Sequence, residues 1–144
     1  MTRRAALGAD DHGPLVDAVA GILAELGFEV VRAGPGPWGS VARATAERVA
    51  AGDVSFAVLC CWTGTGVSIV ANKVAGVRAA LCVDAPTAAG ARAWNDANVL
   101  CLSMRLTTPH VAKEIVAAWV ETAYAASEGE SLACIADLDA GRVR

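Results

Sequence analysis

The sequence contains few aromatic residues, no long apolar run and no excess of positive charge. Aromatic residues make up 5% of the chain and hydrophobic residues 55%, so the apolar content is mostly Ala, Val and Leu. This composition is typical of helices packed closely on buried parallel strands. No segment approaches the roughly 18 uninterrupted apolar residues of a membrane-spanning helix. A net charge of -3 gives no attraction to polyanions or anionic lipid, so we expect neither nucleic acid nor a membrane as a partner.

The cysteines and the N-terminal residues point to a cytoplasmic protein. The chain has five cysteines, an odd number, and most of them lie in or beside apolar runs typical of core strands. Free thiols fit this pattern better than disulfides. The first apolar stretch is only about five residues long, too short for the hydrophobic region of a signal peptide.

Short apolar runs alternate with amphipathic stretches, which is the pattern of repeated βα units. Strands are expected near 4–8, 27–32, 54–61, 77–83 and 97–102. Helices are expected near 14–26, 39–51, 66–74, 86–94 and 108–124. Right-handed crossovers would place helices on both faces of the sheet. The sequence therefore predicts an α/β fold, a three-layer, doubly wound, five-stranded parallel sheet.

The length predicts one domain over residues 1–144. A chain of this size can bury roughly two thirds of the surface that it exposes when unfolded. From residue 125 onward the sequence loses its periodicity before a last apolar patch at 132–138. Residues 125–144 are therefore interpreted as a C-terminal tail, which either packs on a partner subunit or frays.

The most informative segment is Cys60–Ile69, in which a glycine-rich turn follows an apolar strand and opens a helix. Such a turn presents unpaired backbone N–H groups and the positive end of the helix dipole to a ligand. It would stabilise a phosphate or the oxyanion of an enediolate, and it would lower the pKa of a neighbouring thiol. The same residues would also suit a tight turn beside a buried cysteine that has no chemical role.

Two other segments carry polar side chains. Asp10, Asp11 and His12 follow the first strand, where they would orient a polyol or relay a proton. Alternatively, one of the two carboxylates caps the helix that begins near Gly13. The segment Trp94–Asn98 precedes the fifth strand and would either contact a sugar or simply turn the chain.

Together these segments resemble the family of ribose-5-phosphate isomerase B and galactose-6-phosphate isomerase. The resemblance is carried by Gly-x-Asp near the start, Cys-x-Thr-Gly-x-Gly-x-Ser-Ile-x-Ala-Asn-Lys from Cys61, Gly-x-Arg-Ala-Ala-Leu-Cys from Gly76, Asn-Asp-Ala-Asn-Val-Leu from Asn95, and the following Arg105. These motifs occur in the family's order and spacing, over residues 4–124.

The resemblance implies a homodimer or tetramer with active sites at the subunit interface. Such a protein would interconvert an aldose and a ketose through an enediol, with no metal and no organic cofactor. Cys61 resembles the thiolate that moves the proton, and Asp10 and Asn95 resemble groups that hold substrate hydroxyls. These three side chains are expected to converge at the carboxyl edge of the sheet, near a subunit boundary. The residues that resemble the anion hole for the enediolate are Thr63, Gly64, Thr65 and Gly66.

The sequence departs from the family pattern around the sugar itself. Trp94 stands where the family has the histidine that opens the sugar ring, and Trp cannot transfer a proton at neutral pH. Trp62 replaces the first glycine of the cysteine loop. Trp62 and Trp94 are therefore expected to form apolar walls against a sugar face.

The phosphate-binding residues of the family are also altered. Asp11 stands where the family has a histidine that contacts phosphate, with His12 one place later. Glu128 and Leu132 align with two arginines that close over the phosphate, which leaves Arg105 from that set. Lost charge-assisted hydrogen bonds and added repulsion predict poor binding of ribose 5-phosphate.

These departures predict an isomerase that keeps its carbon chemistry and has changed its substrate. The expected partner is a small sugar or sugar phosphate, and a non-phosphorylated sugar or a smaller hydroxy-carbonyl compound fits the changes best. The alternative is a non-catalytic family member that acts as a partner subunit or a small-molecule binder. A nucleotide- or flavin-binding domain is disfavoured, because the chain lacks Gly-x-Gly-x-x-Gly after the first strand and a Walker lysine.

Overall fold

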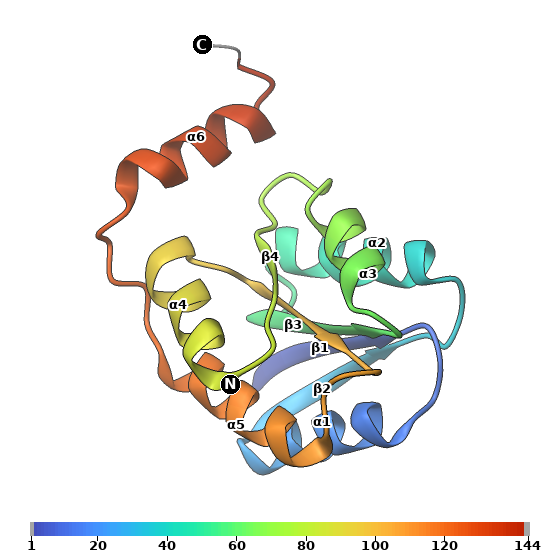
Figure 1. Cartoon of the computed structure of the whole chain (residues 1–144). Coiled ribbons are helices and arrows are strands. Elements are labelled where there is room, and N and C mark those ends of the chain that lie inside the picture. The colour runs from blue at the N-terminus through green and yellow to red at the C-terminus, as the bar shows by residue number, and fades with distance from the viewer. Residues whose placement is uncertain (1, 143–144) are drawn as a thin grey trace.

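A five-stranded parallel sheet forms the centre of the molecule, with the strand order β2-β1-β3-β5-β4 (Figure 1). The computed structural model describes residues 2–142. The strands are β1 (Arg3–Ala9), β2 (Phe28–Ala33), β3 (Phe56–Cys61), β4 (Ala79–Leu81) and β5 (Val99–Ser103). The helices are α1 (Pro14–Glu25), α2 (Trp38–Ala50), α3 (Thr65–Ala71), α4 (Ala85–Asn95), α5 (Pro109–Glu121) and α6 (Gly129–Asp139). The predicted α/β class and the five-stranded parallel sheet are confirmed.

The helices divide between the two faces of the sheet, which gives the predicted three layers (Figure 1). Helices α1, α4 and α5 pack with one face around a core that includes Leu23, Leu100 and Trp119. Helices α2 and α3 pack with the other face around Ala46, Leu59 and Val67. The central strands β3 and β5 are buried along their whole length, as expected for strands covered on both sides.

Strand β4 is shorter than the sequence predicts. It runs over three residues at the edge of the sheet, against an expected range of 77–83. The backbone N–H of Arg78 donates a hydrogen bond to Oδ1 of Asn98 at 2.7 Å, so the pairing of β4 with β5 begins only at the next residue. At its other end the chain soon enters α4, whose first turn is capped by Asp84 through the N–H of Thr87 at 2.8 Å.

The C-terminal segment contains a helix that the sequence analysis did not predict. Helix α6 spans Gly129–Asp139 (Figure 1). None of its residues is buried. Its apolar residues Leu132, Ile135 and Leu138 recur every three positions, which is the helical period over too short a stretch to stand out. Within residues 2–142, no helix combines the length and the apolar character that crossing a bilayer requires.

Asp53 ties the turn between α2 and β3 to the first strand. Its carboxylate accepts a hydrogen bond from Arg48 at 2.6 Å and a second one from Arg4 on β1. The hydrogen bond from Arg48 is the main reason that the pKa of Asp53 lies below its ordinary value, with Arg4 acting in the same direction and partial burial opposing both. The folded state therefore favours the ionised carboxylate.

We expect Asp53→Asn to lower the free energy of unfolding at neutral pH. Because the pKa is lower in the folded state, the carboxylate contributes stability above its ordinary pKa of 3.8, and this contribution disappears as the pH falls through the folded-state pKa. Urea unfolding of both proteins at several pH values should show a deficit at pH 7 that shrinks below pH 3.8. A deficit that stays constant across this range would contradict the assignment.

Candidate active site

A pocket of about 280 Å³ opens at the carboxyl edge of the sheet, where β1 and β3 end. It is lined by Asp10, Trp38, Cys61, Trp62, Thr63, Thr65 and Gly66. Hollows of about 500 and 520 Å³ lie elsewhere, but no thiol lines them. The smaller pocket is the candidate active site because it joins a thiol, a carboxylate and a helix N-terminus at the edge where doubly wound sheets bind ligands.

Asp10 follows the last residue of β1 and brings a carboxylate to this pocket. Its Oδ1 atom is buried and has no hydrogen-bond partner within residues 2–142. Its backbone carbonyl accepts a hydrogen bond from the N–H of Gly36 at 3.1 Å, which fixes the residue against the loop after β2. A buried carboxylate oxygen without a donor lacks the partner that such groups normally have, and a substrate hydroxyl would supply it.

Cys61 is the cysteine that faces the pocket. It is the last residue of β3 and is 5% exposed, whereas its neighbour Cys60 points to the opposite face of the sheet. Burial, together with Cys61 and Asp10 nearby and against a small effect of Arg32, raises the pKa of Cys60 to about 12. Cys60 therefore remains a neutral thiol at physiological pH.

Two other core cysteines are held neutral in the same way. Burial is the main cause that raises the pKa of Cys82 to about 11, and it also raises the pKa of Cys101. Neither of them lines the pocket. These thiols pack as small apolar groups, so Cys61 is the core cysteine placed for chemistry.

The turn between β3 and α3 directs backbone N–H groups toward the pocket. Gly64 is the N-cap of α3, has a left-handed conformation with φ of 74°, and no side chain caps the helix. The first N–H groups of a helix have no partner within it, and those at Thr65 and Gly66 make no hydrogen bond within residues 2–142, so they are available to an anion. The hydroxyl oxygens of Thr63 and Thr65 lie 2.7 Å apart and share a hydrogen bond.

The loop between β5 and α5 holds this turn in place. The backbone N–H groups of Met104 and Arg105 donate to the carbonyl oxygens of Cys61 and Trp62, each at 2.9 Å. The hydroxyl of Ser103 also donates to the carbonyl of Trp62, at 3.1 Å. These bonds bring Arg105 beside the turn, where its exposed guanidinium makes no ion pair with any residue of the described chain.

Trp38 is a pocket residue that the sequence analysis missed. It opens α2, and its indole ring lies where a Cβ atom at Gly66 would come within 3.0 Å of it. The absence of a side chain at Gly66 therefore lets the ring pack over the turn. Trp38 is 50% exposed and forms one wall of the pocket, and the predicted wall residue Trp62 forms another. The sequence order could have predicted a place for Trp38 near the pocket, because Trp38 follows β2, whose carboxyl end lies beside that of β1.

Asp11 and His12 lie beside the pocket without lining it. Both are exposed, and Asp11 accepts a hydrogen bond from the backbone N–H of His12 at 2.8 Å. The alternative that Asp10 or Asp11 caps α1 is wrong, because the N-cap is Gly13 and no side chain caps this helix.

The expectation that Asn95 joins Cys61 and Asp10 is wrong within a single chain. Trp94 and Asn95 end α4, immediately before β5, so they lie at the amino edge of the parallel sheet rather than its carboxyl edge. They line a separate hollow beside β4, where the Trp94 ring lies over Gly90. Trp94 is therefore not a wall of the pocket in its own chain, and the role of Asn95 in substrate binding stays a prediction.

The two aligned phosphate positions in the C-terminal segment are also far along the chain from the pocket turn. Glu128 is the N-cap residue of α6. Leu132 lines a hollow between α6 and the residues Arg78 and Asp96. Neither side chain lines the candidate active site of its own chain.

The family model described as Ribose/Galactose Isomerase matches residues 5–136. This chain belongs to the ribose/galactose isomerase family. This chain is 37% identical to ribose-5-phosphate isomerase B of Escherichia coli over 130 residues, which cover 85% of this chain and 86% of that protein. It is 36% identical to D-erythrulose-4-phosphate isomerase of Pectobacterium atrosepticum over 126 residues, 83% of each.

Two further similarities concern overall length and fold. This chain is 39% identical over 120 residues to a DNA damage-repair/toleration protein of Arabidopsis thaliana. The match covers 39% of the length of that protein. The structure of type B ribose 5-phosphate isomerase from Trypanosoma brucei superposes with a TM-score of 0.90 at 39% identity, covering 96% of this chain and 99% of that one. The predicted family resemblance is thus confirmed in sequence and in fold.

We expect Gly64→Ala to destabilise the protein more than Gly52→Ala does. Both glycines have φ of 74°, where a side chain costs roughly 1–2 kcal/mol. A Cβ at Gly64 would also lie 2.6 Å from Leu81 Cδ1 and 3.0 Å from the backbone of Leu102, whereas nothing lies within 4 Å at Gly52. Overpacking should add about 1–3 kcal/mol at Gly64, measurable by urea unfolding. Equal losses would show that the turn can relax around a methyl group.

Proposed function

We propose that this protein is an aldose–ketose isomerase in which Cys61 transfers a proton between two neighbouring carbons through an enediolate. The observation that carries the proposal is the convergence of three groups on one pocket. These are the Cys61 thiol, the unpartnered Oδ1 of Asp10 and the free N–H groups at the start of α3. The alternative function is that of a non-catalytic partner subunit or small-molecule binder.

Each of these groups has a separate task in the proposed reaction. The thiolate of Cys61 removes the proton from the carbon beside the carbonyl. The electron pair of that C–H bond forms the carbon–carbon double bond of the enediolate, and the π pair of the C=O bond moves to the carbonyl oxygen. The N–H groups of the turn stabilise the oxyanion that forms. The protonated thiol then returns the proton to the neighbouring carbon. The hydroxyl of Thr63, hydrogen-bonded to that of Thr65, moves the second proton between the two oxygens, while Asp10 holds a substrate hydroxyl.

The proposed substrate is an open-chain hydroxy-carbonyl compound. Among the described residues, Asp10 and Cys61 are the titratable groups that line the pocket, and both have other tasks in this reaction. Trp94 cannot donate the proton that opens a sugar ring. A four-carbon sugar that is phosphorylated on its fourth oxygen has no free hydroxyl there to close a five-membered ring, so it needs no acid of this kind. The relative from Pectobacterium atrosepticum is named for such a substrate.

The surroundings of the pocket favour a substrate other than ribose 5-phosphate. The exposed guanidinium of Arg105 is placed to bind one anionic group, and the carboxylate of Asp11 stands exposed on the neighbouring loop. Trp38 and Trp62 offer apolar faces to the carbon chain. A small four-carbon hydroxy-carbonyl compound that stays in the open-chain form suits this combination.

The proposed assembly is a homodimer, or a tetramer built from it, in which a second copy completes each site. Apolar side chains near the pocket mouth are exposed in the single chain, namely Trp62, Ile69 and Leu106. The carboxamide of Asn95 is exposed and has no partner within residues 2–142. In this arrangement the end of α4 from one copy reaches the pocket of the other, which would reunite Asn95 with Cys61 across the interface.

We expect Cys61→Ala to abolish proton exchange and leave the fold intact. The substitution removes the proposed base, and loss of a general base costs about 10²–10⁴-fold in rate. Replacing one small side chain at a strand end should change stability only slightly. Cys60→Ala is the matched control, because Cys60 is the adjacent core thiol and faces away from the pocket. The test measures deuterium incorporation beside the carbonyl, and full exchange in Cys61→Ala would transfer the role to Asp10 or His12.

We expect better turnover of four-carbon substrates than of ribose 5-phosphate. The measurement is a panel of aldoses, ketoses and their phosphates in deuterium oxide, including erythrulose 4-phosphate. Exchange with any member supports an enediol enzyme, and silence across the panel would favour the binder. Efficient isomerisation of ribose 5-phosphate, with a Michaelis constant in the usual range of about 1 μM–1 mM, would refute the substrate proposal.

A further inference from the structure

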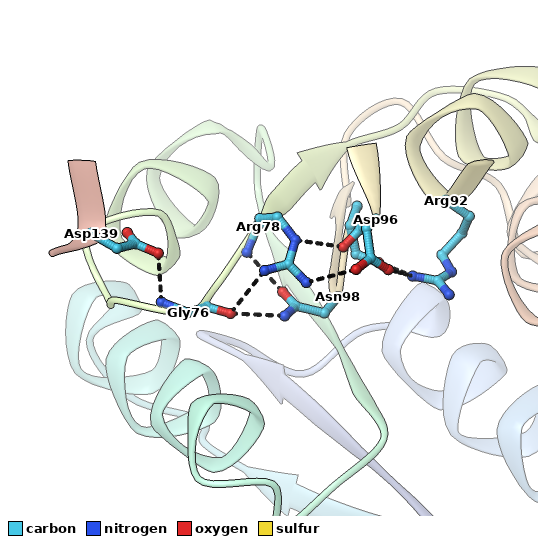
Figure 2. Close-up of polar contacts among 7 residues, drawn as sticks. Gly76, Arg78, Arg92, Asp96, Asn98 and Asp139 are labelled. Carbon is cyan, nitrogen blue, oxygen red and sulfur yellow. Dashed lines mark hydrogen bonds and ion pairs between the residues drawn. The ribbon is translucent and has the colours of Figure 1, made fainter. Parts of the chain in front are cut away.

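A polar network anchors the turn that follows Asn95 (Figure 2). The carboxylate of Asp96 is shared by two arginines, with Arg78 Nη2 3.3 Å from Oδ2 and Arg92 Nη1 3.4 Å from Oδ1. Nε of Arg78 also donates to the backbone carbonyl of Asp96 at 2.7 Å, and Arg92 donates to the carbonyl of Ala97. The turn is therefore held by its side chain and by its backbone.

The same network links three segments that are distant in the sequence. Asn98 accepts from the backbone N–H of Arg78 and donates to the carbonyl of Gly76 at 2.9 Å, which joins the start of β5 to the segment before β4 (Figure 2). The N–H of Gly76 in turn donates to Asp139 of α6 at 2.8 Å. The end of α4 is thus tied to the sheet and, through Gly76, to the C-terminal helix.

Asp96 has a backbone conformation that the network must maintain. It is the C-cap of α4 and has φ of 46° and ψ of 42°, a left-handed conformation that is uncommon for any residue other than glycine. This conformation ends the helix immediately after Asn95, so the network around Asp96 anchors the turn that carries Asn95. The carboxamide of Asn95 itself makes no hydrogen bond in the described part of the chain.

We propose that Asp96, held by Arg78 and Arg92, is a positioning residue that presents Asn95 to the substrate. The inference rests on the proposed function, because it takes Asn95 to be the group that binds a substrate hydroxyl. Asp96 touches no substrate and acts through Asn95 alone. Its effect therefore appears in substrate affinity and disappears once the Asn95 carboxamide is removed.

Asp53 provides a matched control within the same chain. Its carboxylate is also shared by two arginines, and its side chain is exposed to nearly the same extent, 34% against 36% for Asp96. It lies in the turn between α2 and β3 and lines no part of the pocket. Asp53→Asn thus removes an equivalent pair of ion pairs without affecting the segment that carries Asn95.

The test is a double-mutant cycle on kcat and KM with Asp96→Asn and Asn95→Ala. Asparagine keeps the size of the side chain and tolerates the left-handed conformation, so the substitution removes mainly the charge. Each single substitution is expected to lower kcat/KM about tenfold, chiefly through KM, and the double variant should be no worse than Asn95→Ala alone. Asp53→Asn should leave both constants unchanged. Wild-type kinetics for Asp96→Asn, or independent losses that multiply in the double variant, would overturn the inference.

Hydrogen exchange of the backbone amides in 92–98 gives a second readout that needs no activity. Asp96→Asn should speed exchange in this segment, and Asp53→Asn should leave it unchanged. Absence of any effect in Asp96→Asn would overturn the positioning role. A wild-type protein that turns over no substrate would instead refute the proposed function, while the exchange result would still decide whether Asp96 orders the Asn95 segment.

Discussion

The left-handed turn at Gly64 is the constraint on which the candidate site depends. It follows the end of β3 at Cys61 and starts α3, so that the first residues of this helix, Thr65 and Gly66, line the same pocket as Cys61. The clearance at Gly64 is set by Leu81 of β4 and by the backbone of Leu102 of β5, so these two strands determine how tightly the chain can turn. The base and the anion site are therefore fixed by one backbone feature, packed against β4 and β5.

The parallel topology separates the predicted site residues into two groups. Residues that follow a strand, such as Asp10 and Cys61, meet at the carboxyl edge, and residues that precede a strand, such as Asn95, lie at the amino edge. No rearrangement within one sheet brings these edges together. A site that uses both groups requires two chains, which is a physical reason for the homodimer proposed above.

Much of the fold was predictable because the sequence repeats one physical pattern. Apolar runs predicted all five strands, and the amphipathic stretches predicted the ends of α1–α5 to within three residues. Helix α6 was missed because its few apolar residues show the helical period over too short a stretch to stand out. The length of β4 was overestimated because the side chain of Asn98 competes for the Arg78 N–H, a tertiary contact that no local pattern reports.

The site was predictable to the extent that it consists of residues adjacent to strand ends. Asp10, Cys61 and the turn from Thr63 to Gly66 were expected from position alone and do line or border the pocket. Trp38 was missed because it belongs to a different βα unit and reaches the turn only through the space left at Gly66. The expected position of Asn95 at the carboxyl edge was wrong, and the sequence order alone shows why: Asn95 precedes β5, which assigns it to the amino edge.

The division between chemistry and recognition follows from the same geometry. The proposed proton-transfer groups are a buried thiol, a carboxylate with a buried oxygen and backbone N–H groups, all at the ends of core strands. Trp62, Trp94 and Asp11, which depart from the family pattern, are exposed. Their substitution costs little stability, because exposed side chains make few packing contacts. A sheet of this kind can therefore keep its proton-transfer chemistry while the surrounding side chains change the substrate that it accepts.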